Sequence, residues 1–206
     1  MKGLDKLSEN IQYGIGVQRK IIHILLGLLI TVLLMFGVAK KIHFFSLIII
    51  SIIFSFLSRK YRIPVLHQIL DTFEREKEIR SFPGKGFIFY LIGVFLVLSF
   101  FPVEIAMPSI LVLAFADSVG YIFGVRFGKT PHPFTDKKFL EGFIAGIIAG
   151  FIGALVFVPW HEALAASVFA MIVEGIELKI GADEVDDNIT IPLAAAIAIS
   201  VVRFFF

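Results

Sequence analysis

Apolar runs long enough to cross the roughly 30 Å hydrocarbon layer of a bilayer recur along the whole chain. They predict seven helical spans at about residues 21–39, 43–58, 86–102, 105–125, 141–158, 162–178 and 189–206. Only 17% of the residues are charged, which is below the quarter or so that is typical of soluble domains. We therefore expect residues 1–206 to form one all-α domain, a polytopic transmembrane helical bundle. Cysteine is absent, so a disulfide framework, a thiol nucleophile and a thiolate metal site are excluded.

The distribution of basic residues predicts how the bundle is oriented. Of the 19 lysines and arginines, sixteen fall in residues 1–20, 59–85, 126–138 and 179–188, and three fall on the opposite side. The positive-inside rule therefore predicts a cytoplasmic N-terminus, an external C-terminus, and long polar loops on the cytoplasmic side. A secretory signal cleaved near residue 39 is the weaker alternative, because the apolar run before that point is rather long.

Residues 59–85 form a charged stretch between the second and third spans. Apolar side chains recur within it at helical spacing, at Val65, Leu66, Ile69, Leu70 and Phe73. This pattern predicts an amphipathic helix at the cytoplasmic membrane surface.

Asp117 lies inside an apolar span, roughly 13 Å below the cytoplasmic boundary when counted from Arg126 at about 1.5 Å per residue. Gly120 and Gly124 share its helical face, and Gly128 continues the four-residue spacing. An intramembrane carboxylate is costly, which favours a function such as metal ligand or general base. In the structural alternative, the glycines pack helices closely and the acid pairs with a lysine or a backbone group.

The loop at residues 126–142 is basic and ends where the next apolar span begins. It carries four cations, Arg126, Lys129, Lys137 and Lys138. Lysine holds phosphate as a point charge and a helix N-terminus favours anions, so the loop predicts a phosphate site. Glu141, next to Gly142, either binds a divalent cation or complements the helix dipole. Basic loops at this face are also ordinary determinants of topology.

An acidic segment precedes the last span. Residues 183–188 hold four acids and an asparagine, ending in Asp187 and Asn188. Such oxygen ligands suit Mg²⁺, which takes one or two carboxylates together with substrate phosphates. A solvated turn in which Asp187 or Asn188 caps the last helix explains the same composition. Glu174, inside the sixth span, is a further candidate for function.

The first span begins with Arg19, Lys20 and His23 on one helical face. Interfacial cations usually extend toward the membrane surface, so this signal is weak by itself. The other histidines form no metal-ligand pattern with His23. The sequence contains no phosphate-loop, G-x-S-x-G or H-E-x-x-H motif.

Taken together, these segments resemble the CTP-dependent polyprenol kinase family, which contains dolichol kinases, phytol kinases and CTP-dependent diacylglycerol kinases. The matching motifs span nearly the whole chain and are, in order, Arg19-Lys20-x-x-His23-x-x-x-Gly27, Glu78-x(5)-Gly84, Asp117-x-x-Gly120-x(3)-Gly124-x(3)-Gly128-Lys129, Lys137-Lys138-x-x-Glu141-Gly142 and Asp186-Asp187-Asn188-x-Thr190-x-Pro192. The fourth and fifth motifs are the specific ones. Phe139 and Phe143 depart from the pattern, since relatives often carry small or hydroxylated residues around the Glu-Gly.

The resemblance implies phosphoryl transfer from a nucleotide, expected to be CTP, to the hydroxyl of an isoprenoid alcohol of the dolichol, phytol or geranylgeraniol type. Mg²⁺ or another divalent cation is the expected metal ion. The expected catalytic residues are Asp117, Lys138 and Glu141. The expected metal ligands are Asp117, Glu141, Asp187 and Asn188. The expected nucleotide- and phosphate-binding residues are Arg19, Lys20, His23, Gly124, Gly128, Lys129, Lys137, Lys138 and Gly142.

Other activities remain open on the sequence alone. A CTP-dependent diacylglycerol kinase uses the same donor, and phosphatidate cytidylyltransferases, which form CDP-lipids, share part of the central pattern. A transporter is the remote alternative, because the polar groups cluster at one face and no internal repeat is visible. The expected partners are a membrane lipid alcohol and a nucleoside triphosphate, with no nucleic acid.

Overall fold

The computed structural model of the chain describes residues 2–61, 82–176, 178–180 and 183–205. The elements are α1 (Lys2–Met35), α2 (Lys41–Lys60), α5 (Lys85–Phe100), α6 (Val103–Val112), the π-helical turn η1 (Leu113–Asp117), α7 (Ser118–Phe127), β1 (Pro131–His132), β2 (Thr135–Phe139), α8 (Leu140–Ala154), α9 (Trp160–Ile176), β3 (Lys179–Ile180), β4 (Asp183–Glu184) and α10 (Asp187–Phe205). The amphipathic helix predicted at 59–85 lies outside the described residues, apart from 59–61 and 82–85. Glu78 lies outside them as well.

A helical segment covers each of the seven predicted spans, with α6, η1 and α7 forming one continuous rod. Four segments are long and apolar enough to cross a membrane, namely Gly14–Met35, Lys41–Lys60, Val103–Phe127 and Asp187–Phe205. Helices α5 and α8 are apolar but shorter. The all-helical membrane architecture is therefore confirmed, whereas the count of seven spans and the cytoplasmic N-terminus stay predictions.

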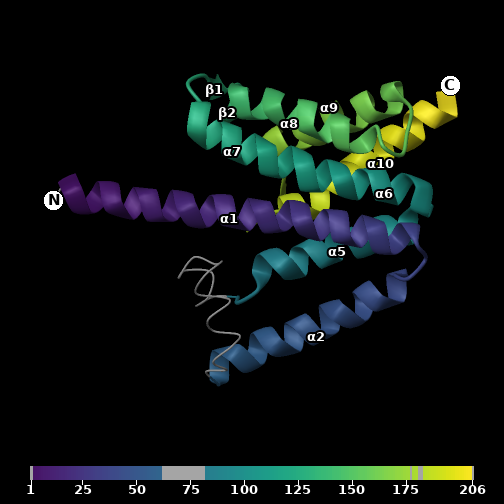
Figure 1. Cartoon of the computed structure of the whole chain (residues 1–206), viewed down its shortest axis with the longest axis horizontal. Coiled ribbons are helices and arrows are strands. Elements are labelled where there is room, and N and C mark those ends of the chain that lie inside the picture. Colours follow the sequence, from purple (N-terminus) through teal and green to yellow (C-terminus); the bar gives the residue numbers. More distant parts are fainter. Residues whose placement is uncertain (1, 62–81, 177, 181–182, 206) are drawn as a thin grey trace.

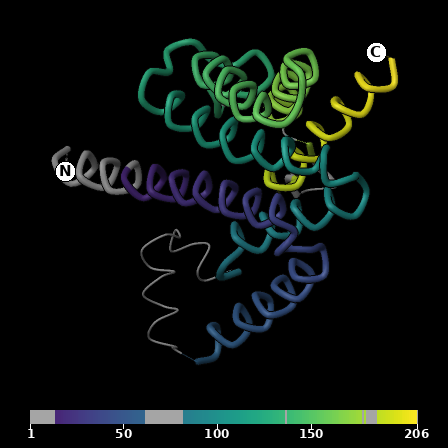
Figure 2. Tube along the Cα trace, turned by 45° about the vertical axis from the view of Figure 1, so that its right-hand side comes forward, coloured from purple at the N-terminus to yellow at the C-terminus, as the bar shows by residue number. Residues whose placement is uncertain are grey.

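The helices form two groups on either side of α1 (Figures 1 and 2). On one side, α7 packs on α8, and α9 packs on both α8 and α10. On the other side, α5 packs on α10 and α2 packs on α5. Helices α1 and α2 are joined by the connection at residues 36–40 and diverge from it toward the opposite end (Figure 1).

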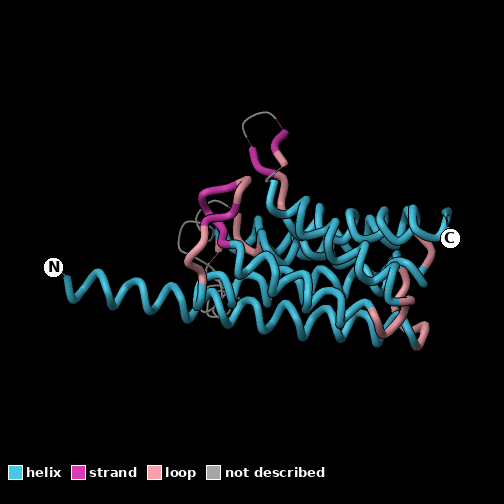
Figure 3. The backbone as a smooth tube through the Cα atoms, turned by 90° about the horizontal axis from the view of Figure 1, so that it is seen from above, coloured by secondary structure: helices cyan, strands magenta, loops and turns pink. Residues whose placement is uncertain are grey.

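Two short antiparallel hairpins, which the sequence did not predict, lie at one end of the bundle. Strand β1 pairs with β2, and β3 pairs with β4. Both hairpins lie at the end from which α1 enters, whereas the C-terminus lies at the other end (Figure 3). The basic loop and the acidic segment are thereby brought to the same end of the bundle.

Glycines let α7 and α8 approach more closely than any other residue would permit. A Cβ atom added at Gly142 would lie 2.5 Å from the carbonyl oxygen of Gly120, and one at Gly146 would lie 2.9 Å from that of Ala116. Such atoms cannot be accommodated without moving the backbone of the neighbouring helix. Close helix packing is therefore one role of the glycine stripes, as the structural alternative predicted.

The rod from Val103 to Phe127 contains a π-helical turn that ends at Asp117. Turns of this kind place one extra residue in a helix and are frequent at functional sites. Helix α1 packs against η1 as well as against α6 and α7. The turn therefore presents the intramembrane acid to the first helix.

Candidate active site

Asp117 is 6% exposed and is held by two residues of α1. The Lys20 ammonium donates to both of its carboxylate oxygens, at 2.6 Å each. His23 lies one helical turn further along α1, with its Nε2 atom 3.5 Å from Oδ2 of Asp117. The weak motif at the start of the first span and the intramembrane acid thus belong to one cluster. The charge of the buried carboxylate is thus compensated by a neighbouring cation.

Tyr90 of α5 extends this cluster and was not found from the sequence. Its ring packs edge-on against the His23 imidazole, with 4.4 Å between the ring centroids. The side chain is almost fully buried, and its hydroxyl has no hydrogen-bond partner within the described part of the chain. A tyrosine in an apolar helix carries no distinguishing pattern, so only the tertiary structure reveals it.

Lys138, at the end of β2, joins two further acids. Its ammonium donates to the backbone carbonyl of Glu174 at 2.9 Å, to Oε1 of Glu174 at 2.8 Å, and to Oδ2 of Asp187 at 3.4 Å. Burial lowers the pKa of Lys138, but the two carboxylates raise it more, and the pKa lies above its usual value. The lysine is therefore protonated at neutral pH. Its acids lie on α9 and α10, so it holds three elements together.

The acidic segment folds into a turn at the start of α10. The backbone and side-chain amides of Asn188 both donate to Oδ1 of Asp186, at 3.1 and 2.7 Å. This leaves the Asp187 carboxylate on the side of Lys138, with its side chain 41% exposed. The turn is thus a helix start that is capped by Asp186 rather than by Asp187 or Asn188, and the predicted Mg²⁺ site stays a prediction.

These residues surround a polar cavity of about 320 Å³ at the hairpin end of the bundle. Five cations line it, Arg19, Lys20, Lys85, Lys137 and Lys138. Three acids line it as well, Asp117, Asp186 and Asp187. A smaller cavity of about 190 Å³ adjoins it through Lys20, Asp117 and Lys138, and reaches Gly124, Gly142, Glu174 and the buried His132. Lys85, Asp186 and His132 are site residues that the sequence did not assign.

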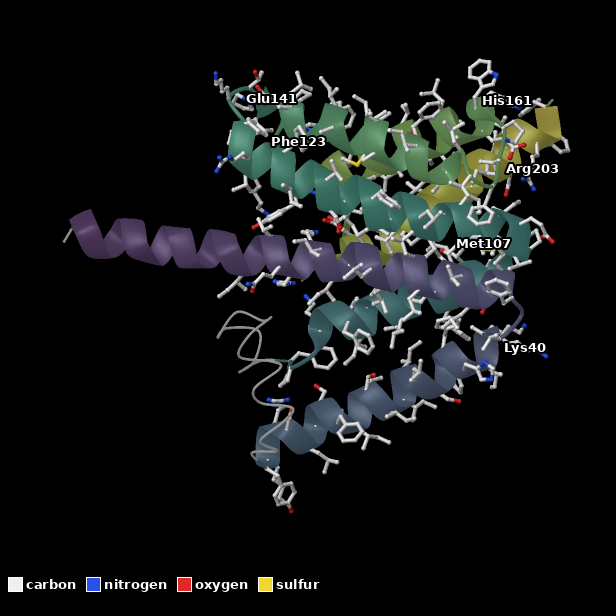
Figure 4. The ribbon with its side chains drawn as sticks, viewed as in Figure 1. Lys40, Met107, Phe123, Glu141, His161 and Arg203 are labelled. Carbon is white, nitrogen blue, oxygen red and sulfur yellow. The ribbon has the colours of Figure 1, made fainter. Side chains whose placement is uncertain are left out.

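Four of the predicted site residues, His23, Gly128, Lys129 and Glu141, line neither of these two cavities. Glu141 is exposed, and its carboxylate accepts from the backbone amides of Lys129 and Thr130 and from the Thr130 hydroxyl. It lies at the same end as Phe123 and far from His161 and Arg203 (Figure 4). Gly128 packs against the Phe139 ring. Glu141, Lys129 and Gly128 thus shape the basic loop, and their predicted part in catalysis and phosphate binding stays a prediction.

The predicted metal ligands are distributed over this end of the bundle. Among the described residues, no group of three His, Asp or Glu side chains is arranged to hold a metal ion. Asp117 is engaged by Lys20, whereas Asp186 and Asp187 face the polar cavity together. Two carboxylates beside a phosphate-sized polar space fit Mg²⁺, which keeps waters and takes its remaining ligands from substrate phosphates.

An apolar cavity of about 460 Å³ lies between α1, α2 and α5. It meets the polar cavity at Arg19, Lys20, Gly86 and Asn188, which line both. The guanidinium of Arg19 passes close to Gly86, where an added Cβ would lie 3.4 Å from it. Away from this junction the walls of the apolar cavity are mostly aliphatic and aromatic, formed by Ile22, Leu26, Phe54, Phe87 and Ile88. A cavity lined by charged side chains thus meets a mostly apolar cavity.

Fold and site define a class, a helical integral membrane protein in which a charged cavity adjoins an apolar cavity. The chain is 32% identical over 188 residues to an uncharacterised protein of Methanocaldococcus jannaschii, an alignment that covers 89% of this chain and 92% of that protein. It is 33% identical over 84 residues to CTP-dependent diacylglycerol kinase 1 of Schizosaccharomyces pombe, covering 41% of this chain and 38% of the kinase. It is 28% identical over 131 residues to the chloroplastic phytol kinase 1 of Arabidopsis thaliana, covering 55% and 42%.

The chain belongs to the CTP-dependent polyprenol and lipid kinase family, as its motifs predicted. It spans less than half the length of each of these two named kinases. No family model and no solved structure matches the chain.

Proposed function

We propose that the protein is a kinase that transfers the γ-phosphoryl group of CTP to the hydroxyl of a membrane lipid alcohol. The observation that carries the proposal is the junction of the two cavities at Arg19 and Lys20. The nucleotide reaches the polar cavity from water, and the lipid reaches the apolar cavity from the bilayer. The names of the relatives support CTP as donor and a lipid alcohol as acceptor.

In the proposed reaction the lipid oxygen forms a bond to the γ-phosphorus, and the bond from that phosphorus to the β–γ bridging oxygen breaks. The leaving CDP keeps the electron pair, and the hydroxyl proton passes to the Asp117 carboxylate. Catalysis of this kind is mainly positioning and neutralisation of charge. Lys20, Lys138 and the other cations of the polar cavity hold the phosphates. When the Lys20 ammonium turns to a phosphate, it frees Asp117 to accept the proton.

A divalent cation fits the same end of the cavity. Asp187 and Asp186 would hold Mg²⁺ together with phosphate oxygens, and the ion would neutralise charge that develops between the β- and γ-phosphates. Asp187 would then exchange its contact with Lys138 for the metal ion. Asn188 would act indirectly, since its amides orient Asp186.

Two classes of acceptor fit the apolar cavity. The first is the isoprenoid alcohol implied by the sequence motifs, of the dolichol, phytol or geranylgeraniol type. The second is diacylglycerol, which the names of relatives support equally. Both place a primary hydroxyl on a long apolar body, as the cavity junction requires.

The purified protein, incubated with γ-labelled CTP, MgCl₂ and each of dolichol, phytol, geranylgeraniol and dioleoylglycerol, tests the proposal. We expect a labelled lipid monophosphate and CDP. A cytidylyltransferase would leave these alcohols unlabelled and, when supplied with a lipid monophosphate such as phosphatidate, would form a CDP-lipid and release labelled pyrophosphate. No labelled lipid from any of these alcohols, with either CTP or ATP as donor, would overturn the proposal.

We also propose that the polar cavity faces the cytoplasm. The two hairpins, which belong to the predicted cytoplasmic loops at 126–138 and 179–188, lie at one end of the bundle (Figure 3), which agrees with the segregation of the basic residues. Because the chain has no cysteine, a single one can be introduced without a competing thiol. A cysteine in place of Lys137 should be labelled only from the cytoplasmic side, and one in place of Trp160 only from outside. The reverse pattern would contradict the orientation.

A further inference from the structure

A row of serines on α2 faces the apolar cavity. Ser51, Ser55 and Ser58 follow one another at spacings of four and three residues, which places them on one helical face. All three line the cavity. Ser55 is 5% exposed, whereas Ile50 and Ile53 on other faces of the same helix are about half exposed, at 46% and 52%. The one polar face of an otherwise apolar helix is thus turned inward.

The hydroxyls of Ser51 and Ser55 are not satisfied by their own helix. At Ser99, Ser109 and Ser200, in other helices, the hydroxyl donates to the backbone carbonyl four residues earlier, at 2.7 to 2.8 Å. This is the usual arrangement in an apolar helix. Ser58 likewise donates to the carbonyl of Ser55 at 2.8 Å. For Ser51 and Ser55 no such bond exists within the described residues, so their hydroxyls remain available to an occupant of the cavity.

The opposite wall of the cavity carries a second unsatisfied hydroxyl. Tyr90 lines the same cavity, is 1% exposed, and has no hydrogen-bond partner among the described residues. Buried polar groups are almost always hydrogen-bonded, and exceptions call for a ligand or another specific cause. Two walls with unpaired hydroxyls indicate an occupant that carries oxygen acceptors close to its reacting end.

We propose that the lipid acceptor is a glycerol lipid whose two chains are attached through oxygen atoms, and that Ser51 and Ser55 donate to those oxygens. The inference rests on the proposed kinase function. With its free hydroxyl at the junction near Lys20, such a lipid carries its linkage oxygens on the two neighbouring carbons. These oxygens then lie beside α2 at the level of Ser55 and Ser51. The two serines precede Ser58 by about one and two helical turns, counted at about 1.5 Å per residue.

An isoprenoid alcohol cannot make these contacts. Beyond its single hydroxyl it offers only hydrocarbon, so it would leave the hydroxyls of Ser51 and Ser55 without a partner in the cavity. A site built to hydrogen-bond a substrate discriminates against an analogue without the matching group, because the groups of the site then lose their partners. The serines are therefore specificity-determining residues for the acceptor.

Steady-state kinetics with CTP and four acceptors test this inference: dioleoylglycerol, a dialkylglycerol diether, geranylgeraniol and phytol in mixed micelles. We expect the glycerol lipids to have the higher kcat/KM. The double variant Ser51→Ala/Ser55→Ala should lower kcat/KM for the glycerol lipids roughly tenfold, mainly through KM, since each lost hydrogen bond contributes modestly. The values for geranylgeraniol and phytol should stay unchanged or rise. Ser200→Ala, whose hydroxyl is bonded within its own helix away from the cavity, is the matched control.

The ester and the ether lipid separate the two sources of linkage oxygen. A loss confined to dioleoylglycerol identifies carbonyl oxygens as the partners, and a loss with both identifies the linkage oxygens. Equal losses for all four acceptors, or a wild-type preference for geranylgeraniol or phytol, would overturn the inference while leaving the kinase intact. If no acceptor is phosphorylated, the proposed kinase function fails. In that case a binding assay decides the inference by itself: each lipid is used to displace a bound fluorescent diacylglycerol from the wild type and from the double variant. Displacement that does not depend on the serines overturns the inference.

Discussion

The two groups of helices that flank α1 differ in how much of their surface they bury. In the rod Val103–Phe127, which contains Asp117, 72% of the most apolar 18-residue stretch is buried inside the protein. In α2 the corresponding share is 17%. The buried group is held by glycine contacts between α7 and α8, whereas α2 is held chiefly by α5 and leaves an apolar cavity beside it. Close packing fixes charged groups, and an open apolar wall admits a lipid. If the proposed function holds, the closely packed, rigid group carries the chemistry and the open group carries the acceptor.

The largest effect is expected at Asp117, the buried acid of the rigid group. Asp117→Asn keeps the size of the side chain but removes the charge that holds Lys20 and accepts the proton. We expect kcat to fall about a hundredfold or more, as for general acid–base groups, in a protein that still folds but melts at a somewhat lower temperature because Lys20 loses its partner. Turnover by the purified variant, together with a thermal melt, measures both quantities.

Glu162 provides the matched control, because it is also a buried acid. It is 6% exposed and accepts from Arg203 at 2.8 Å, at the end of the bundle opposite to the site. Glu162→Gln should lower stability by about 1 kcal/mol, a small value because the Arg203 side chain is 36% exposed, and leave activity per folded molecule intact. Wild-type turnover by Asp117→Asn would return Asp117 to a structural role and leave the Asp186–Asp187 turn as the remaining metal site.

The next effect is expected at Lys138, which links the hairpin to α9 and α10. Lys138→Ala should raise the activation free energy by roughly 2–4 kcal/mol, by analogy with the loss of a donor to a developing oxyanion. It should also lower stability, since Glu174, 9% exposed, loses its partner. Adding Glu174→Gln should recover stability without recovering activity.

Lys129→Ala gives the comparison within the same loop. Lys129 lies outside both polar cavities, so activity should change by less than about threefold, the loss of a single exposed charge being small. Equal losses at Lys129 and Lys138 would mean that the whole loop closes on the nucleotide, and that the structural division drawn here is wrong.

The smallest effect is expected on packing within the rigid group. Gly146→Ala would place a Cβ 2.6 Å from the Met171 side chain and 2.9 Å from the Ala116 carbonyl, so we expect a loss of about 1–3 kcal/mol in stability. Activity per folded molecule should change little. Gly14→Ala on α1, where nothing lies within 4 Å, should be neutral or stabilising by up to about 1 kcal/mol. Similar melting temperatures for the two variants would show that the rigid group is not held by glycine contacts.

The positions of the helices could be predicted from the sequence because lipid requires long apolar segments, and polar residues interrupt them clearly. The same contrast identified Asp117, Lys138, Asp187 and Glu174 as residues in need of an explanation. The family could also be predicted, since the motifs that define it are local. The sequence left open whether the glycines serve the site or pack helices. Gly142 lines a cavity and also permits the close contact between α7 and α8.

What only the tertiary structure decided is which of these residues meet. The pairing of Lys20 with Asp117, the π-helical turn beneath it, and the place of Tyr90 depend on contacts between helices that are far apart in sequence. Glu141, which the family resemblance placed among the expected catalytic residues, accepts hydrogen bonds from the backbone amides of Lys129 and Thr130, and its part in catalysis stays a prediction. Periodicity states which face of a helix is polar but not what that face will touch. The serine face of α2 can be interpreted only because α1 and α5 form a cavity with it, which the sequence does not show.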